Sequence, residues 1–361
     1  MRAARFYGRR DIRIEEVPEP SIGPGDLLLK ISAVGICGTD AHEFAAGPQM
    51  FPIDHPHPVS GHVGPMIPGH ELAGVVVDKA PDVAGFEAGS LVVSGAGISC
   101  GTCHWCLRAS TNLCERYSTL GLHQDGGLAE YAAVPASTCV DASGWGISAD
   151  TAALAQPMSI AVHALRRGRL QRAESAVILG AGGIGVFLTY AAAAWSDQVF
   201  VADLDRRRLQ VAESLGATKT VEVGGETSIE TVLDDNRTIP SVIYEVSGSA
   251  AGFEQALRLA QRGTRIVLVG LQHGHKQVDP VDISLRELEL VGTSAHVCSL
   301  DLPEALRLLA SRDGGWTDVA PQALSLNELV SDGLEPLAEN RTTRIKTLVD
   351  PWVDTARATS A

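Results

Sequence analysis

Three residues with metal-binding side chains stand at the two ends of one segment of the chain: Cys37, which is followed by Gly-Thr-Asp, and the adjacent pair His70 and Glu71. Between them, residues 47–68 are rich in Pro, Gly and His and can fold back so that the thiolate meets the imidazole. A thiolate, an imidazole and a carboxylate suit a zinc ion with one open position, as in catalytic zinc sites. The spacing alone leaves open that Cys37 is a small buried apolar residue.

Four further cysteines are clustered within fifteen residues, in a loop that also contains Gly, Ser and Thr. Their spacing is C-x2-C-x2-C-x7-C, at Cys100, Cys103, Cys106 and Cys114. Four thiolates that leave no place for water form a closed, structural zinc site. The alternatives are a disulfide pair, which a reducing cytosol disfavours, and an iron–sulfur cluster, whose usual cysteine runs this spacing does not match.

A glycine-rich turn follows an apolar strand and opens an apolar helix; it contains Gly180, Gly182, Gly183, Ile184 and Gly185. Asp203 ends the next predicted strand, 18 residues after the last of these glycines. This is the context of the dinucleotide fingerprint, in which the pyrophosphate lies at the helix N-terminus and the acid accepts the ribose hydroxyls. Asp203 favours NAD over NADP, although Arg206, Arg207 and Arg208 could bind a 2′-phosphate. A similar turn in an unrelated α/β domain is the alternative.

The elements that must position these residues change in character near residue 151. Before it the chain reads as short strands separated by Gly and Pro, at residues 26–34, 74–77, 90–94 and 129–134, which predicts a mostly β domain. An Ala-rich helix over 152–165 then bridges to alternating strands and helices, at 176–179, 183–195, 198–203, 205–215, 241–246 and 264–270. Such alternation predicts a parallel sheet with helices on both faces.

The last part of the chain is predicted to complete the first domain. A helix is expected over 301–311, and a strand over 345–349 is expected to return to the β domain. The tail from Val353 is small and polar, so we expect it to fray.

The composition and charge of the chain limit the kinds of partner that it can bind. The chain has 361 residues, 45% of them hydrophobic and 20% charged, which is typical of a globular protein of two domains. A net charge of −14 argues against nucleic acid and anionic membranes as partners. The N-terminus is charged where a signal peptide is apolar, and no apolar run approaches the roughly 18 residues of a membrane span. We therefore expect a cytoplasmic protein whose seven cysteines are unpaired.

Together these motifs resemble the zinc-dependent medium-chain alcohol dehydrogenases, in particular the branch of the 2,3-butanediol, sorbitol and threonine dehydrogenases. Residues 37–44, 121–131 and 286–292 are similar to butanediol dehydrogenases. The resemblance covers the chain to about residue 351. It implies an α/β protein of two domains: a GroES-like, mostly β catalytic domain with a structural zinc lobe at 1–156, and a doubly wound Rossmann NAD-binding domain at 157–295. Residues 296–361 would return to the catalytic domain and end in the tail.

The resemblance also implies roles for single residues. Cys37 and His70 match ligands of a catalytic zinc, and Glu71 matches a carboxylate that binds this metal or lies just behind it. Thr39 and His42 match the hydroxyl and the imidazole of a proton relay. Val269, Gly270 and Ser294 are expected to line the nicotinamide, and Lys346 to lie near the pyrophosphate.

One residue departs from this branch, which usually has a zinc-binding Glu where this chain has Gln156. An amide oxygen is neutral and a poorer donor than a carboxylate. We hypothesise that Gln156 ligates a catalytic zinc that is held more loosely but is a stronger Lewis acid. The alternative is that Gln156 does not touch the metal. His55, His57 and His62 match no motif and are interpreted as surface residues of the loop.

The resulting hypothesis is a homodimeric or homotetrameric enzyme with two zinc ions per chain and NAD. It would interconvert a secondary alcohol or vicinal diol, such as 2,3-butanediol or a polyol, and its ketone. Two alternatives remain at this point: a zinc-independent NAD(P)H reductase of the same fold, and a non-enzymatic protein on a retained dehydrogenase scaffold. The Thr39 and His42 pair argues against the last of these.

Overall fold

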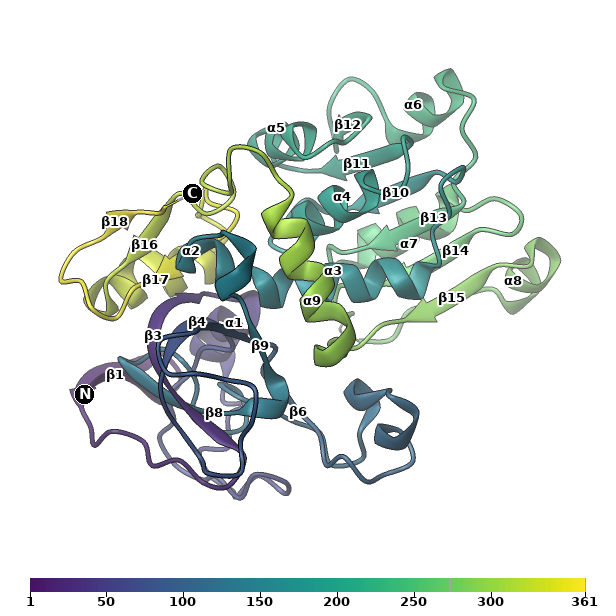
Figure 1. Ribbon diagram of the computed structural model, residues 1–361. Helices are drawn as coiled ribbons and strands as arrows, with labels where there is room; N and C mark the ends of the chain where they lie inside the picture. The colour runs from purple at the N-terminus through teal and green to yellow at the C-terminus, as the bar shows by residue number, and fades with distance from the viewer. Residues whose placement is uncertain (273, 361) are drawn as a thin grey trace. The chain divides into compact units, whose positions relative to one another are not determined.

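A computed structural model describes residues 1–272 and 274–360. The chain divides into two compact units, drawn in Figure 1: unit 1 is Met1–Ser159 with His296–Ala361, and unit 2 is Ile160–Ala295. The first boundary lies within helix α3 (Ala155–Gly168), and the second lies between Ala295 and His296. No helix of the described residues is long and apolar enough to cross a membrane.

Unit 1 is built on an eight-stranded sheet with the strand order β18-β16-β17-β3-β4-β5-β9, to which β8 is added by pairing with β3. Its bounds are β3 Asp26–Gly35, β4 Glu71–Lys79, β5 Leu91–Ser94, β8 Tyr131–Pro135, β9 Cys139–Asp141, β16 Gln322–Leu324, β17 Leu348–Val349 and β18 Arg357–Ala358. Leu27, Leu29 and Ile31 of β3 are fully buried at every second position, as in a strand with one face in the core. This core continues through Phe44 and Leu120.

Smaller elements complete unit 1 around this sheet. Two further two-stranded antiparallel sheets are formed by β1 (Arg2–Gly8) with β2 (Asp11–Glu16) and by β6 (Gly97–Ile98) with β7 (Ser118–Thr119). The α-helices are α1 Gly38–Ala46, α2 Ala149–Ala152, α9 Cys298–Ala310 and α10 Glu335–Ala338. Short 3-10 helices lie at η1 Cys106–Arg108, η2 Thr111–Leu113, η3 Ala136–Thr138, η4 Ser143–Trp145 and η5 Leu326–Glu328, and a π-helix lies at η6 Leu329–Leu334.

Unit 2 is a six-stranded parallel sheet with the order β12-β11-β10-β13-β14-β15. The strands are β10 Ala176–Leu179, β11 Val199–Asp203, β12 Lys219–Glu222, β13 Val242–Glu245, β14 Arg265–Leu268 and β15 Glu289–Gly292. The helices between them are α4 Gly185–Ala193, α5 Arg206–Ser214, α6 Ile229–Asp235, α7 Ala250–Leu259 and α8 Pro280–Arg286. The strand order reverses between β10 and β13, which is where doubly wound folds bind their ligands. The Rossmann architecture predicted from the alternating pattern is confirmed.

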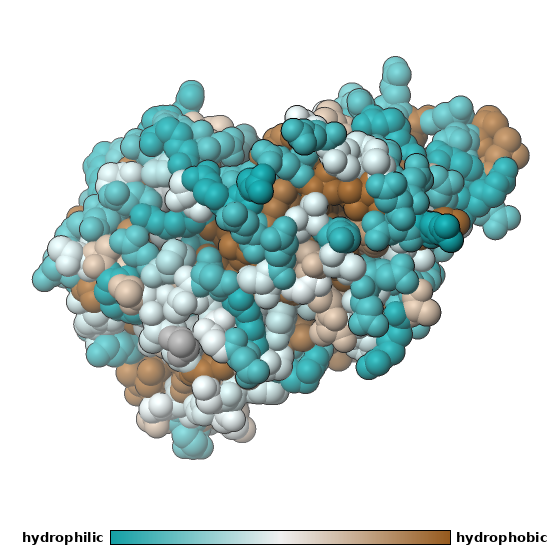
Figure 2. Space-filling view, turned by 90° about the horizontal axis from the view of Figure 1, so that it is seen from above, coloured by the Kyte–Doolittle hydropathy of each residue, from teal (hydrophilic) through white to brown (hydrophobic). Residues whose placement is uncertain are grey.

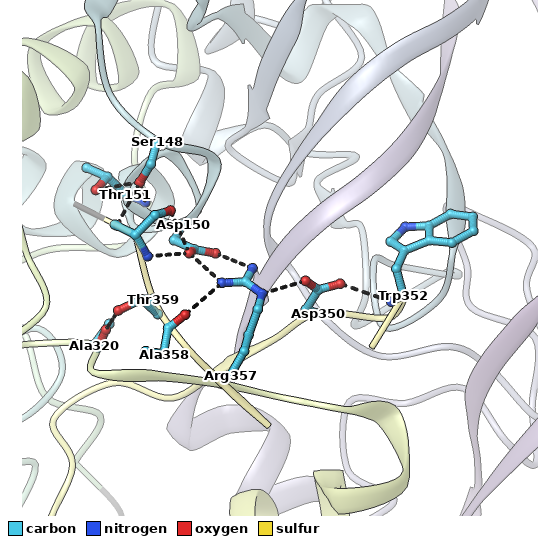
Figure 3. A network of polar contacts seen from close by, with 10 residues as sticks. Ser148, Asp150, Thr151, Ala320, Asp350, Trp352, Arg357, Ala358 and Thr359 are labelled. Carbon is cyan, nitrogen blue, oxygen red and sulfur yellow. Dashed lines mark hydrogen bonds and ion pairs between the residues drawn. The ribbon is translucent and has the colours of Figure 1, made fainter. Parts of the chain in front are cut away.

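The prediction that the C-terminal tail frays is wrong. β18 pairs with β16, and the Arg357 guanidinium donates to both carboxylate oxygens of Asp150 at 2.7 and 2.8 Å and to Asp350 at 2.7 Å (Figure 3). Ser360 donates its N–H to Asp150 at 2.8 Å as well. The small, polar composition concealed these ion pairs because their partners lie far away in the sequence.

Candidate active site and metal centres

The structure brings the ligand atoms of Cys37, His70 and Glu71 within 4.8 Å of one another. The register of β3 against β4 produces this meeting, because Gly35 at the end of β3 pairs with Glu71 at the start of β4. Cys37 follows two residues later and caps the N-terminus of α1. A Cβ at position 35 would lie 2.2 Å from Glu71 Oε2, so the close approach of the two strands requires glycine.

Asp40 is a carboxylate to which the sequence analysis gave no role. It accepts the N–H of Cys37 at 2.9 Å, and its Oδ1 lies 3.6 Å from Nδ1 of His70. Burial lowers the pKa of His70, but the charges of Asp40 and Cys37 outweigh this and raise it well above its usual value. Because a metal ligand must be neutral imidazole, binding of zinc at His70 would release a proton. Asp40 could have been found from the sequence, because an acid three residues after the residue that caps the start of a helix often accepts the N–H of that residue.

Glu71 and Lys346 form an ion pair that is almost completely buried. The Lys346 ammonium contacts both carboxylate oxygens and donates to the carbonyl of Ile36 at 3.3 Å. Burial lowers the pKa of Lys346, but the negative charges of Glu71 and Cys37 raise it above its usual value. We expected Lys346 near a cofactor pyrophosphate; its contacts in the structure are with a candidate metal ligand of unit 1.

Thr39 and His42 are one helical turn apart on α1, so they share one face of the helix. The Thr39 hydroxyl lies 3.8 Å from the sulfur of Cys37. His42 is exposed, and its Nε2 lies 3.4 Å from Oε1 of Gln49. Thr39 thus lies beside the Cys37 sulfur and His42 is open to solvent, and their joint role as a proton relay remains a prediction.

Gln156 lies in the first turn of α3 and is 8% exposed. Its backbone carbonyl accepts the Ser159 hydroxyl at 2.6 Å. Ligation by the Gln156 amide remains a prediction.

The four cysteines of the second cluster face one another in a lobe between β6 and β7, with their ligand atoms within 4.8 Å. Sulfur–sulfur distances include 3.5 Å between Cys103 and Cys106 and 3.9 Å between Cys103 and Cys114. The N–H groups of Cys100 and Arg116 each point at the Cys114 sulfur at 3.3 Å. Hydrogen bonds from Thr102 and Cys103 lower the pKa of Cys100 to about 6, while burial raises that of Cys114 to about 11. Four sulfurs with N–H support form a closed tetrahedral donor set.

The glycine-rich turn of unit 2 packs as tightly as a dinucleotide turn requires. Gly180 has φ +106°, and a Cβ at Gly185 would lie 1.9 Å from the carbonyl oxygen of Gly180, so helix α4 can approach β10 only with glycine there. Asp203 accepts the N–H of Ala181 at 2.6 Å and that of Asp205 at 2.8 Å. A carboxylate has about four acceptor positions, so Asp203 keeps capacity for further hydrogen bonds.

The other predicted cofactor residues lie at the same carboxyl edge of the sheet. Val269 and Gly270 follow β14, Ser294 follows β15, and Arg208 lies in the first turn of α5. A Cβ at Gly270 would lie 2.2 Å from the Gly248 nitrogen, which brings the chain after β14 against the chain after β13.

The loop histidines differ in their surroundings. His55 is exposed, as expected. His57, by contrast, stacks on His123 with ring centroids 4.3 Å apart and an interplanar angle of 9°. Each ring accepts backbone N–H groups at Nδ1, from Ser60 for His57 and from Thr119 for His123. The loop is therefore fixed by a ring pair that the sequence gave no reason to expect.

Two family models match the chain: the alcohol dehydrogenase GroES-like domain over residues 23–144 and the zinc-binding dehydrogenase over residues 183–311. Curated relatives include an (R,R)-butanediol dehydrogenase of Neisseria gonorrhoeae, 30% identical over 97% of this chain and 99% of the relative. The chain belongs to the zinc-dependent medium-chain alcohol dehydrogenase family. It is therefore an oxidoreductase. The sorbitol dehydrogenase of Bacillus subtilis is 28% identical over 97% of both chains.

Solved structures agree with this assignment. The crystal structure of the 2R,3R-butanediol dehydrogenase of Bacillus subtilis superposes with a TM-score of 0.88 at 28% identity, covering 97% of this chain and 99% of that one. A zinc-binding dehydrogenase of Sinorhizobium meliloti bound to NADP gives a TM-score of 0.84 at 28% identity, covering 97% and 99%. The GroES-like and Rossmann domains predicted for this dehydrogenase are thus both confirmed.

Proposed function

We propose that this dehydrogenase interconverts a secondary alcohol or vicinal diol and its ketone, with NAD as the hydride acceptor and two zinc ions per chain. The observation that carries the proposal is the cluster of Cys37, His70 and Glu71, with the hydroxyl of Thr39 beside the cysteine sulfur. A closed structural zinc site needs no hydroxyl beside its ligands, whereas alcohol oxidation needs a path for a proton.

The donor atoms fit zinc at both clusters. One sulfur, one imidazole nitrogen and one carboxylate oxygen within 4.8 Å leave a position open, whereas the four sulfurs of the lobe leave none. The first cluster would hold the catalytic zinc through Cys37 and His70, with Glu71 or Gln156 as the third ligand so that one position stays open, and the second would hold the structural zinc. Zinc held there would supply Lewis acidity towards a substrate oxygen.

The glycine-rich turn of unit 2 fits a dinucleotide. A Cβ at Gly182 would meet no atom within 4 Å, so the backbone there is open to a close-lying pyrophosphate, while Gly180 and Gly185 are needed for packing. Asp203 would accept the ribose hydroxyls and repel a 2′-phosphate, which favours NAD. Arg208 lies at the start of the next helix, where it could bind a ribose or a phosphate. NAD held there would supply the acceptor for the hydride of the substrate.

The chain's own groups would perform the remaining steps. The Thr39 hydroxyl would accept a hydrogen bond from the substrate hydroxyl and pass its proton towards His42, which exchanges it with solvent. Histidine suits this exit because it titrates near neutral pH. Asp40 would orient the His70 ring through Nδ1, and Lys346 would hold the Glu71 carboxylate in place.

The substrate class is proposed from the relatives. The similar proteins named above are a butanediol dehydrogenase and a sorbitol dehydrogenase, so their named substrates are a diol and a polyol. We therefore place 2,3-butanediol and polyols first in a substrate screen.

A homodimer or homotetramer is proposed from one edge of unit 2. β15 is the outermost strand of the parallel sheet, so one side of it lacks a paired strand in the described chain, and Leu290 on it is 38% exposed. On the neighbouring α8, Val281 and Leu285 are 62% and 68% exposed, and apolar residues also gather at the right-hand end of Figure 2, where Figure 1 draws α8. An open edge with apolar side chains is the kind of surface that a second copy covers. Sedimentation of wild type and Val281→Glu tests this proposal.

A reducing, cytoplasmic location is proposed from the cysteines. All seven are free thiols, and four of them form the lobe cluster. A compartment that oxidises thiols would compete with metal for this cluster.

The function is tested by following NADH formation with a panel of diols, polyols and simple secondary alcohols, each with NAD and with NADP. The proposal predicts turnover of secondary alcohols with NAD preferred, and loss of that turnover in Cys37→Ser. Equal turnover in wild type and Cys37→Ser would contradict it.

A further inference from the structure

Glu43 is a completely buried carboxylate of α1, one residue after His42. Its oxygens accept the N–H groups of Gln49 and Met50, both at 2.9 Å, and that of Phe51 at 3.4 Å. All three donors belong to the start of the loop over residues 47–68. A buried charge is costly unless hydrogen bonds compensate it, so these backbone contacts hold Glu43 and the loop together.

The close fit around Glu43 extends to the neighbouring backbone. The N–H of Gly47 donates to the Glu43 carbonyl at 2.8 Å, and a Cβ at position 47 would lie 2.6 Å from the Glu43 carboxylate. Phe51 packs edge-to-face against Phe6 with ring centroids 4.8 Å apart. The segment from Gly47 to Phe51 is thus fixed at one end by Glu43 and at the other by the core.

This segment contains Gln49, whose side chain contacts His42, the solvent-exposed member of the proposed proton relay. Oε1 of Gln49 lies 3.4 Å from Nε2 of His42, and the N–H of the same residue is held by Glu43. Glu43 is buried and His42 is exposed, but both contact Gln49. The position of the His42 ring therefore depends on a carboxylate that contacts neither the metal ligands nor the relay hydroxyl.

We propose that Glu43 is a positioning residue of the relay: it anchors residues 49–51 and through Gln49 sets the orientation of the His42 imidazole. This inference rests on the proposed function, because the orientation of His42 matters for turnover only if His42 carries protons. A purely structural role would instead make Glu43 important for folding and leave the proton step unchanged.

The test uses Glu43→Gln, which keeps the size of the side chain but places an NH2 group against backbone donors. Gln49→Ala leaves the anchor intact and removes the contact to His42. Glu328→Gln is the matched control, because that carboxylate also accepts a backbone N–H, from Ser325 at 2.9 Å, in a different segment. Zinc content and melting temperature are measured for every variant.

Amide hydrogen exchange reports on the anchor without activity. Hydrogen bonds to charged groups are stronger than those between neutral groups, so exchange at Gln49 and Met50 should accelerate roughly 10- to 100-fold in Glu43→Gln. It should stay unchanged in Gln49→Ala and Glu328→Gln.

Activity then reports on the relay. We expect kcat at neutral pH to fall about tenfold in both Glu43→Gln and Gln49→Ala, since general acid–base groups contribute about 100-fold or more when well placed. The double variant should be no worse than either single one, because both act through the same contact. Added imidazole should restore much of the rate in the two variants and have little effect on wild type and Glu328→Gln.

The outcomes separate the two claims. An active wild type together with an unchanged kcat and pH profile in Glu43→Gln overturns the inference and leaves the proposed function standing. Unchanged amide exchange in Glu43→Gln overturns the anchor itself. A wild type without dehydrogenase activity on the whole panel overturns the proposed function, and the relay role falls with it.

Discussion

The two candidate zinc clusters of unit 1 are built in opposite ways. The four cysteines of the lobe come from fifteen consecutive residues and are supported by N–H groups of the same loop. Cys37, His70 and Glu71 meet only because β3 and β4 pair in one register. The lobe is partly exposed, whereas His70 and Glu71 are buried beside Asp40 and Lys346. A structural ion needs only a loop, but a reactive ion needs a buried site whose charges come from several elements.

The largest effects are expected when one sulfur is removed from each cluster, and the two effects should differ in kind. Cys37→Ser should lower turnover by about 1000-fold or more while the protein stays folded, because the polarising metal is lost. Its turnover is measured beside its circular dichroism spectrum. A folded variant with wild-type turnover would show that the cluster around Cys37 is not the reactive one.

Cys103→Ser should act on stability instead. Structural zinc contributes folding free energy directly, of order 10 kcal/mol in small zinc peptides, and part of it is lost when one of four ligands goes. We expect a lower melting temperature and one zinc ion fewer per chain. The lobe would have no structural role if zinc content fell while the melting temperature stayed the same.

Lys346→Met tests the charges that surround the buried cluster. Removing one partner of a buried ion pair costs about 3–5 kcal/mol because the other charge is left uncompensated, and Lys346 and Glu71 side chains are 4% and 0% exposed. Urea unfolding should show this loss. Arg341→Met, from an exposed pair with Glu339, is the control and should leave stability almost unchanged, because water screens exposed pairs. Equal effects of the two substitutions would contradict the account.

Gln156→Glu tests whether the two clusters differ in how fast they release zinc. A carboxylate is a stronger zinc ligand than an amide, so the variant should lose its catalytic zinc to a chelator about tenfold more slowly, while loss from the lobe stays unchanged. Zinc release is followed with a colorimetric chelator. Identical release curves would show that Gln156 does not ligate.

The smallest expected effect is on the pH dependence of stability, through the stacked rings of His57 and His123. His57 belongs to the loop over residues 47–68, which connects Cys37 to His70 and Glu71. Burial and the neighbouring His57 lower the pKa of His123 to about 4, and burial lowers that of His57. The unfolded chain therefore binds more protons than the folded one below about pH 6.5, so stability falls as the pH drops from there towards 4. In His123→Asn the melting temperature should drop less between about pH 6.5 and 4 than it does in wild type. The difference should be a few degrees, which corresponds to roughly 1 kcal/mol. An unchanged slope in the variant would exclude the ring pair as its cause.

The same contrast explains what could be predicted from the sequence. The lobe and the glycine-rich turn are local, so the spacing of their residues was enough. The buried pair of Glu71 and Lys346 spans 275 residues, and the contact of Asp40 with His70 depends on strand register. Neither contact produces a pattern among neighbouring residues of the sequence, so neither could be predicted from it.

Two misses in the fold have the same origin. The tail was expected to fray because it is small and polar, but Arg357 binds Asp150, which lies 207 residues earlier. β12 was not recognised because only Val221 of its four residues is buried, as on the edge of a sheet. Long strands and helices with a strong apolar period were predicted well, since their burial pattern is local.

The central claim is that one chain holds a reactive and a structural zinc in these two clusters. Elemental analysis of protein purified without chelator or added metal tests it most directly, on wild type, Cys37→Ser and Cys103→Ser. The account predicts two zinc ions per wild-type chain and about one in each variant. A single zinc in wild type that Cys103→Ser removes and Cys37→Ser leaves in place would contradict it, and would favour a zinc-independent reductase.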